Sequence, residues 1–499
     1  MSMRLFPNSF IKGYFKSSKY ALCFLLLTCA LMLPACGEHQ QSPEEDDNVL
    51  TYAALNPVND KLTRSIERFN EAHPDVPIEI HDYSDEGGRE RLQFELLLGQ
   101  VPDILELRCY GDAGEDVKGP DKQYYLPGSY TGPAEGYFMP YRQLAQKGYL
   151  EDLWPYIEND PNLGREAVLE APLKAAEVNG GLYMLFERVE IFTLIARASV
   201  VGNRYGWTLE DMMDAYTAMP EGSTIMRYNM TKREVFYNLL CNSLERFIDR
   251  ETGECTFDGK EFRALVGFLE TLPDEDEVEY EKPQDVEEEI MRRIKNGTQM
   301  LEGMSISWPR NICRSDSIFQ ERAAFVGYPT ADGSSGSFFY LTGAVLGMSS
   351  TCRNKEAAWE YIRQMITPRL RKSSSSIVAS DRSVDTPVNL NDYEVLCWYE
   401  LDYMAYVLSY DSEDPLKEYL PIRHFQYGPE IYLMDILTEK DLQRHRDLID
   451  HTTQLFWPED GLSDIVWETL GPYFAGDRTL DDTIGLLQNR VGLYLDENR

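Results

Sequence analysis

Residues 49–105 read VLTYAALNPVNDKLTRSIERFNEAHPDVPIEIHDYSDEGGRERLQFELLLGQVPDIL, and this stretch decides the fold class. The elements expected in it, in order, are a buried strand at 49–55, a helix at 59–73, a strand at 78–80, a helix ending at Gly99 and a strand at 102–105. The first helix is indicated by Leu62, Ile66 and Phe69, which recur at helical spacing. Strands that alternate with helices predict a parallel sheet with right-handed crossovers.

A second strand and helix signal appears late in the chain. Residues 324–329 and 341–348 are expected as strands around a Gly/Ser turn, followed by a helix that ends before Pro368. The interval 154–268 is expected to be mostly helical, as is the C-terminal third, whose last helix takes Thr479 as N-cap. The chain therefore crosses between two lobes. The predicted boundaries are 49–153 plus 325–370 for lobe 1, and 154–324 plus 371–499 for lobe 2.

The first 36 residues have the order of an export signal. Four basic residues precede an apolar run at 20–32, and Leu33-Pro34-Ala35-Cys36 follows. This order resembles a bacterial lipoprotein signal peptide, in which Cys36 becomes the lipid-modified first residue. The alternative, a transmembrane helix, needs about 20 apolar residues, which is more than this run supplies. We expect residues 1–35 to be the signal peptide and 36–48 a flexible acidic tether, with the mature protein lipid-anchored on the outer face of the cytoplasmic membrane.

Charge and composition exclude several classes of partner. The formal net charge of −36 repels phosphate backbones, so no nucleic-acid partner is expected. The acidic run at 274–289 is expected as a solvated loop leading into a helix, since it lacks the alternation and the Gly of an EF-hand. No metal or cofactor is expected. Six cysteines beyond Cys36 show no CxxC spacing, and whether they pair stays open: Cys109, Cys241, Cys255, Cys313, Cys352 and Cys397.

Seven short motifs follow one another in a fixed order between residues 49 and 370. They are FNEAHPDVPIEI (69–80), GQVPDI (99–104), GYLEDL (148–153), GLY (181–183) with YGWTLE (205–210), NG (296–297) ahead of WP (308–309), VGYP (326–329) and NKEAAW (354–359). In this order they resemble the extracellular solute-binding proteins of ABC transporters, the sugar-binding family 1 that includes maltose-binding protein. After GLY this chain reads MLFER where the family usually has a small residue and a proline, so the identity of the ligand stays open.

The resemblance implies a type II periplasmic-binding-protein-like fold. Each of its two lobes has a mostly parallel sheet flanked by helices, and the C-terminal part is helical. Ligand is bound in the cleft between the lobes, hinge strands let the lobes close on it, and ABC permease subunits receive the closed form. The resemblance further implies a monomeric substrate-binding lipoprotein that captures a carbohydrate and is not an enzyme. Among carbohydrates, an oligosaccharide is the expected ligand.

Seven residues are candidate ligand contacts: Trp308, Glu187, Arg188, Asn56, Tyr110, Tyr340 and Trp398. Trp308 falls where the resemblance places a Trp, with core packing as the alternative. Glu187 and Arg188 are expected at the end of the strand that begins near Tyr183, with an interlobe salt bridge as the alternative. Asn56 and Tyr110 follow predicted parallel strands, at whose carboxyl ends ligands tend to bind. Tyr340 and Trp398 are included because aromatic faces stack on sugar rings.

Two other functions stay open. A lipid-anchored sensor or interaction protein on the same fold would carry the same sequence signals, because fold does not fix function. A surface glycoside hydrolase or a peptidase would need facing carboxylates, or a nucleophile with its base. The chain has neither a GxSxG elbow nor an HExxH motif, so hydrolysis is the less favoured reading.

Overall fold

The computed structural model describes residues 48–497. Within that range it omits residues 86, 111–135, 229, 241–243, 245, 250–251, 275–282, 373–376, 379–384, 410–423, 428–429 and 458–460. The predicted signal peptide, the lipidation site Cys36 and the predicted tether up to residue 47 lie outside the described residues. Asn48–Arg499 form one compact unit.

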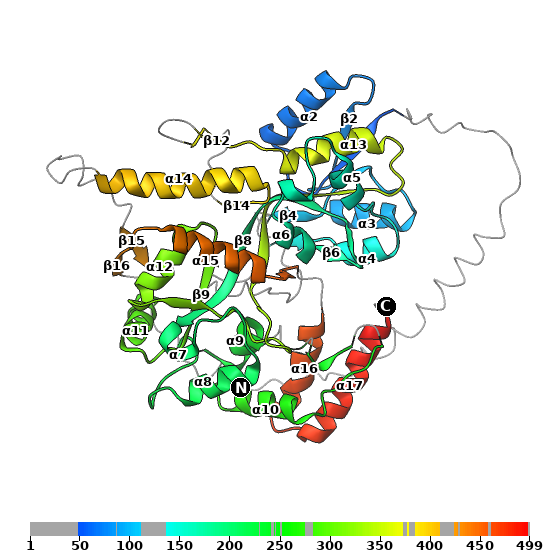
Figure 1. Cartoon of the computed structure of the whole chain (residues 1–499). Coiled ribbons are helices and arrows are strands. Elements are labelled where there is room, and N and C mark those ends of the chain that lie inside the picture. Colours follow the sequence, from blue (N-terminus) through cyan, green and yellow to red (C-terminus); the bar gives the residue numbers. More distant parts are fainter. Residues whose placement is uncertain are drawn as a thin grey trace, which may run out of the picture. The chain divides into compact units, whose positions relative to one another are not determined.

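The N-terminal part has the predicted parallel organisation. Its elements are β1 (Leu50–Ala54), α2 (Asp60–Ala72), β2 (Ile78–Asp82), α3 (Gly88–Leu97) and β3 (Ile104–Glu106). β1 pairs in parallel with β2 and with β3, so it lies between them (Figure 1). The side chain of Asn59 caps α2, because it accepts hydrogen bonds from the backbone N–H groups of Lys61 and Leu62. Ile66 and Phe69 are buried on its inner face, as their spacing predicts.

Two long antiparallel strands, β8 (Leu185–Arg197) and β11 (Phe338–Met348), form what we call the central ribbon. The main path of the sheet runs β10-β8-β11-β3-β1-β2, with β9 and β14 also paired to β8 and β17 to β11. The added strands are β9 (Leu301–Ile306), β10 (Ala323–Phe325), β14 (Thr386–Pro387) and β17 (Gln454–Leu455). The α/β class is confirmed. Parallel pairing holds for β1 with β2 and β3 and for β11 with β17, whereas each described partner of β8 runs antiparallel to it.

The buried apolar side chains form two cores. The first core contains β1 and β3 side chains together with Val189 and Ile191 of β8. The second core contains Leu194 and Ala196 of the same strand, packed with helices that include the C-terminal one. Ile195, which lies between Leu194 and Ala196, belongs to the first core, so this end of β8 separates the two cores and faces one with each side. Two cores agree with a two-lobed organisation, and the predicted lobe boundaries stay a prediction.

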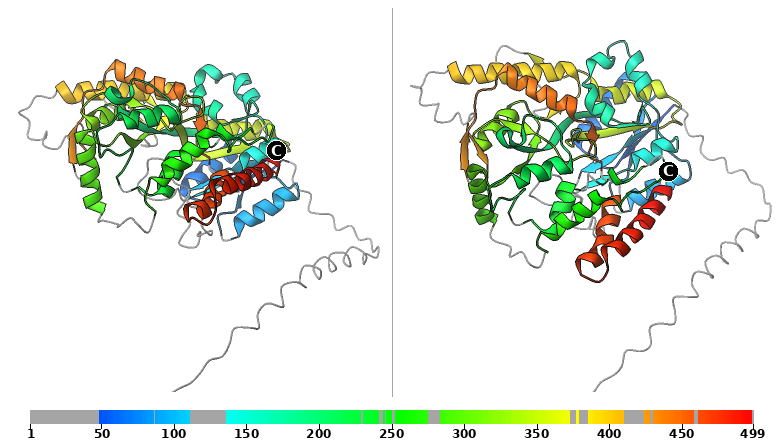
Figure 2. Two further views of the ribbon diagram at one scale, coloured as in Figure 1. Left: turned by 90° about the horizontal axis from the view of Figure 1, so that it is seen from below. Right: turned by 60° about the horizontal axis from the view of Figure 1, so that its bottom comes forward.

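The other elements surround this framework (Figures 1 and 2). The helices are α4 (Tyr141–Gln146), α5 (Trp154–Asn159), η1 (Arg165–Ala167), α6 (Glu170–Ala175), α7 (Ala198–Val201), α8 (Leu209–Thr217), α9 (Lys232–Val235), η2 (Phe236–Leu240), α10 (Lys260–Glu270), α11 (Pro283–Asn296), α12 (Arg310–Phe319), α13 (Lys355–Ile362), η4 (Arg363–Ile366), α14 (Leu390–Ser409), α15 (Glu439–His451), α16 (Leu462–Phe474) and α17 (Leu480–Glu497). The short strands are β4 (Arg108–Tyr110), β5 (Gly136–Phe138), β6 (Glu177–Val178), β7 (Gly181–Leu182), β12 (Arg371–Lys372), β13 (Ile377–Val378), β15 (His424–Tyr427) and β16 (Glu430–Leu433). In the interval expected to be mostly helical, α9 continues directly as the π-helical η2. α16 and α17 pack side by side, and Thr479 accepts a hydrogen bond from the Asp482 N–H as predicted.

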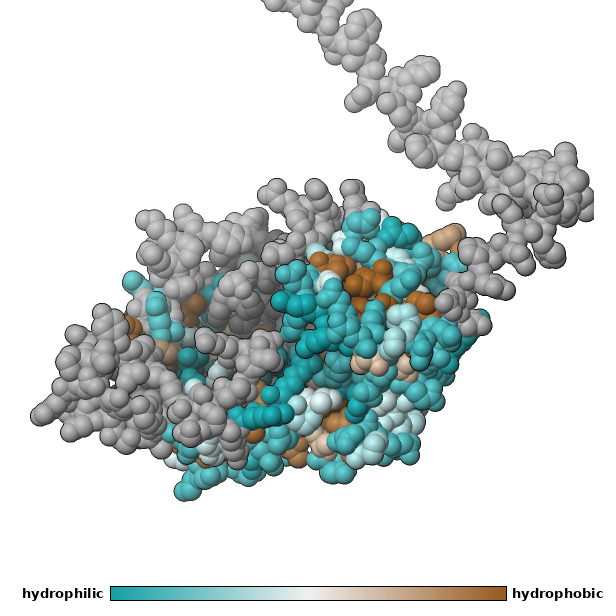
Figure 3. Space-filling model, turned by 90° about the horizontal axis from the view of Figure 1, so that it is seen from above, coloured by the Kyte–Doolittle hydropathy of each residue, from teal (hydrophilic) through white to brown (hydrophobic). Residues whose placement is uncertain are grey.

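The described surface is mainly hydrophilic, and from above it is interrupted by a compact apolar patch (Figure 3). Phe94, Leu97 and Leu98, at and just beyond the C-terminal end of α3, are among the exposed large apolar side chains. The described cysteines are free thiols: Cys109, Cys255, Cys313, Cys352 and Cys397. Within the described residues, no helix is long and apolar enough to cross a membrane.

Candidate ligand-binding site on the central ribbon

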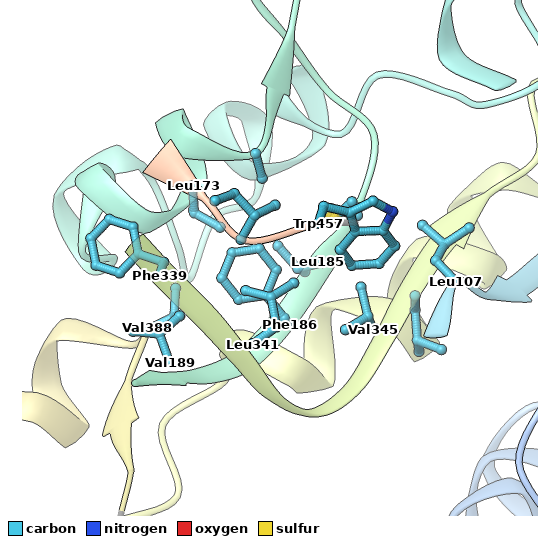
Figure 4. Close-up of a cluster of buried hydrophobic side chains, with 14 of the residues drawn as sticks. Leu107, Leu173, Leu185, Phe186, Val189, Phe339, Leu341, Val345, Val388 and Trp457 are labelled. Carbon is cyan, nitrogen blue, oxygen red and sulfur yellow. The ribbon is translucent and has the colours of Figure 1, made fainter. Parts of the chain in front are cut away.

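The central ribbon has one apolar face. Leu185, Val189, Phe339, Leu341 and Val345 point into a buried cluster that is completed from outside the ribbon by other side chains (Figure 4). Each of these five side chains is at most 1% exposed. This face anchors the ribbon in the first core.

The opposite face is polar and aromatic. Because side chains alternate along a strand, and residues opposite each other share a face, the register decides which groups meet there. The cross-strand neighbours are Arg188 with Thr342, Glu190 with Tyr340, and Phe192 with both Phe338 of β11 and Ser305 of β9. The hydroxyl of Thr342 is buried and has no hydrogen-bond partner among the described residues. This face therefore carries aromatic surface and charge together with a buried hydroxyl that has no partner among the described residues.

Tyr340 is the aromatic centre of this face. The guanidinium of Arg108 lies 4.4 Å from its ring centroid and donates a hydrogen bond to its hydroxyl. A second nitrogen of Arg108 donates to the backbone carbonyl of Leu341. The rings of Phe192 and Phe456 lie 5.3 and 6.1 Å from that of Tyr340, centroid to centroid. The predicted Tyr340 thus belongs to a fixed aromatic cluster.

Glu190 and Asp385 form a pair of carboxyl groups beside Tyr340. Burial raises the pKa of Glu190, the hydroxyl of Ser305 opposes that shift by donating a 2.6 Å hydrogen bond, and the neighbouring charge of Asp385 raises the pKa further. The Glu190 carboxyl therefore gives up its proton less readily than an exposed carboxyl does. Its oxygens offer hydrogen-bonding groups beside the ring of Tyr340.

Glu187 and Arg188 lie inside β8 and not at a strand end, which corrects the prediction, because residues 185–197 form one continuous strand. The carboxylate of Glu187 lies 3.5 Å from an Arg188 nitrogen and 2.5 Å from an Arg369 nitrogen. Opposite it, β11 carries one extra residue between Thr342 and Val345. This bulge includes Gly343, whose φ of +82° is a conformation that glycine adopts without strain. Glu187 is thus held in an ion pair beside the bulge.

Trp308 follows β9 and is half-buried. The guanidinium of Arg310 lies 4.3 Å from its ring centroid. Arg310 is itself held by Glu400 of α14 through a 2.7 Å hydrogen bond. Burial raises the pKa of Glu400, while its hydrogen bond to Arg310 lowers it. Trp308 follows directly after Ser307 in the chain, and Ser307 hydrogen-bonds to Glu190.

The remaining predicted residues are distributed differently. The side chain of Asn56 donates to the carboxylate of Glu106 at 2.8 Å and to the carbonyl of Arg108 at 2.9 Å, so it braces the strand that carries Arg108. Tyr110 ends β4, and its side chain lies outside the described residues. Trp398 is half-buried on α14, and Glu400 of the same helix hydrogen-bonds to Arg310 beside Trp308.

Three residues of this face were not among the predicted contacts: Arg108, Glu190 and Asp385. The signal for Glu190 is present in the sequence, since charged residues at 188 and 190 alternate with apolar ones at 189 and 191. A strand predicted through that segment places Arg188 and Glu190 on one face. Arg108 is a charged residue inside an apolar run, which is a similar signal. Asp385 has no such local pattern.

No protein-family model and no curated protein sequence matches the chain. Solved structures similar to it include an extracellular solute-binding protein family 1 member from Alicyclobacillus acidocaldarius, at 12% identity and a TM-score of 0.45 over 90% of this chain and 98% of that one. The sugar-binding protein MalE of Xanthomonas citri is similar at 13% identity and a TM-score of 0.47 over 90% and 98% of the two chains. A periplasmic oligogalacturonide-binding protein of Yersinia enterocolitica is similar at 11% identity and a TM-score of 0.46 over 90% and 99%.

Proposed function

We propose that this chain is the substrate-binding lipoprotein of an ABC importer, and that it captures a carbohydrate between two lobes and delivers it to a membrane permease. The observation that supports this most is the polar and aromatic face of the central ribbon. It lies on two strands whose side chains contribute to both cores. The ordered motifs and the lipoprotein-like leader in the sequence point the same way.

The chemistry of this face suits a sugar. A pyranose ring has an apolar face that stacks on aromatic rings, and a rim of hydroxyls that both donate and accept hydrogen bonds. Tyr340 and Trp308 supply rings whose positions are fixed by Arg108 and Arg310. The Glu190 and Asp385 carboxyl groups supply hydrogen-bonding partners for the hydroxyls, and the hydroxyl of Thr342 lies on the same face.

The ribbon also suits a hinge. A ligand shifts an equilibrium between open and closed states only through interactions that differ between them. A ligand can contact the ribbon and both lobes at the same time only when the lobes are closed. Ligand binding therefore favours the closed conformation, and the permease recognises that conformation.

Hydrolysis is a weaker candidate for the same face. The paired carboxyl groups of glycoside hydrolases are typically about 5 Å apart or more, because sugar or water must fit between them. Glu190 and Asp385 instead hydrogen-bond to each other. A sensor or interaction protein that binds the same ligand class without transport remains the alternative.

The test is a panel of mono- and oligosaccharides against the mature chain, made from residue 37 onward. Ligand at 100 times its dissociation constant stabilises the folded state by about 2.7 kcal/mol, which is measurable as a rise in melting temperature. We expect one class of oligosaccharide to raise it, with the sugar recovered unchanged by chromatography. A rise with peptides or amines alone refutes the carbohydrate assignment, and recovery of cleaved sugar supports the hydrolase.

Anchoring and transport need their own experiment. With the full-length chain expressed in bacteria, we expect Cys36 to carry lipid by mass spectrometry and the protein to fractionate with membranes, while Cys36→Ala is released. Cross-linking to permease subunits in the presence of ligand separates transport from sensing. A monomer is expected by light scattering.

A further inference from the structure

We infer that a pocket between α5 and α13, outside the central ribbon, is a second saccharide-binding site. The two helices are neighbours in Figure 1 and border an open surface pocket of about 710 Å³. Its lining, which we call the α5–α13 pocket, includes Glu151, Tyr156, Asp160, Glu356, Trp359 and Arg363. None of these residues belongs to the polar face of the ribbon, so the inference does not depend on the function proposed above.

The volume fits a small ligand. Pockets that bind small molecules are typically about 300–1,000 Å³, and this one lies in the middle of that range. A mono- or disaccharide is of this size. Because the pocket is open to solvent, it can take a short sugar or one end of a longer one.

The pocket has an aromatic wall whose rings are held in place. The rings of Tyr156 and Trp359 lie 5.7 Å apart, centroid to centroid, and are tilted by 39°. The hydroxyl of Tyr156 donates to Glu151 at 3.1 Å, and Lys355 donates to the same carboxylate at 2.8 Å. Because Trp359 is 7% exposed, the half-buried Tyr156 is the ring that can face a ligand.

Asp160 organises the rest of the pocket. Its side chain is 4% exposed, and it accepts hydrogen bonds from the Trp359 indole at 3.1 Å and from Arg363 at 3.3 Å. The backbone N–H of Asn162 donates to it at 2.9 Å. Asp160 thereby fixes an aromatic ring, a guanidinium and a loop with a single carboxylate.

The polar rim offers both donors and acceptors. Arg363 and the amides of Asn159 and Asn162 can donate, and Glu356 and Glu360 can accept. Arg363 is already aligned by a 2.7 Å hydrogen bond to Glu360. Sugar hydroxyls need both kinds of partner next to an aromatic face, and side chains fixed in advance lose little entropy when they bind. These features together assign a saccharide to this pocket.

The experiment measures hydrogen–deuterium exchange of the mature chain with a panel of mono- and disaccharides, each at millimolar concentration. We expect a bound sugar to protect peptides covering residues 151–162 and 355–363. Tyr156→Ala removes the stacking ring and is expected to weaken this binding about tenfold. Tyr156→Phe keeps the ring and is the matched variant that retains binding.

Controls separate the two sites and exclude unfolding. Trp308→Ala alters only the ribbon site, so protection at α5 and α13 is expected to persist in it even if the proposed carrier function is wrong. Circular dichroism of Tyr156→Ala and Tyr156→Phe checks that both variants fold. No protection by any sugar of the panel, equal binding by Tyr156→Ala, or protection by the polyamine spermidine alone overturns the inference.

Discussion

The guanidinium of Arg108 lies 4.4 Å from the ring centroid of Tyr340, although the two residues are 232 positions apart in the sequence. Arg108 is 4% exposed and also donates to the carbonyl of Leu341, so one side chain ties β4 to the central ribbon. The pair links the first core to the polar face on which we place the ligand.

Arg108→Lys is expected to destabilise the fold. Lysine keeps the charge but loses the planar stacking and the two hydrogen bonds, so the free energy of unfolding should fall by about 1–3 kcal/mol. Urea denaturation measures this change in the free energy of unfolding. The control is Arg64→Lys on the exposed side of α2, where a change within about 0.5 kcal/mol is expected. An equal effect of the two substitutions contradicts a special role for Arg108.

Trp308→Ala is expected to weaken binding of the sugar found by the panel by at least about tenfold. It should also abolish a ligand-dependent change in tryptophan fluorescence, because we propose that this ring stacks on the sugar. Titration calorimetry and fluorescence measure the two effects. Trp467→Phe in the second core is the control and should leave both unchanged. An unchanged dissociation constant in Trp308→Ala assigns this residue to packing.

Glu190→Gln is expected to stabilise the protein at high pH. Because the pKa of Glu190 is raised in the folded state, the folded state holds its proton more tightly than the unfolded state does. Stability from this group is therefore present at low pH and is lost as pH rises through the raised pKa. Glutamine does not ionise, so Glu190→Gln should have the higher urea midpoint at about pH 8 and a similar one at about pH 4.

Glu187→Gln is the contrasting variant on the same strand. Glu187 is held between Arg188 and Arg369, so its removal leaves two cations without their carboxylate. We expect lower stability at about pH 8, the opposite sign to that of Glu190→Gln. If the urea midpoints of both variants at about pH 8 change in the same direction, the raised pKa of Glu190 does not explain the change in Glu190→Gln.

His445 is expected to make the protein acid-sensitive. It is fully buried, its Nδ1 lies 2.9 Å from the Tyr393 hydroxyl, and its Nε2 has no partner among the described residues. Burial lowers its pKa to about 3, so the unfolded state binds a proton below about pH 6.5 while the folded state does not. Stability is complete above about pH 6.5 and falls progressively toward pH 3.

The size of this effect can be isolated with His445→Gln. When the pH falls from about 7 to about 5, His445 should lower the free energy of unfolding of the wild-type protein by about 2 kcal/mol. The free energy of unfolding of His445→Gln should not fall by this amount. Urea denaturation at the two pH values gives the difference. His451 is exposed at the end of the same helix, and His451→Gln should retain the wild-type pH dependence.

Local patterns in the sequence predict those features that depend on a single helix. The helix at 59–73, the buried stripe of Ile66 and Phe69, and Thr479 ahead of the last helix depend only on neighbours within a turn or two. Each was predicted correctly. Helix capping and helical spacing are local in the chain, so a single sequence contains them.

The candidate site could be predicted only in part. Tyr340 and Trp308 were predicted from their residue type and from resemblance, but their partners Arg108 and Arg310 were not, because those contacts depend on tertiary packing. The length of β8 was missed since charged residues at 187, 188 and 190 interrupt its apolar run. In the sequence, charged residues between two apolar segments look like a loop that separates two short strands. In the structure they lie within one long strand.

That shared strand has a consequence for how the chain can be divided. Val189 and Ile191 are buried in one core, and Leu194 and Ala196, a few residues further on, are buried in the other. A fragment cut anywhere along β8 would leave one half without a strand that its core needs. The two halves should therefore unfold in a single transition, and neither should be obtainable as a stable separate protein.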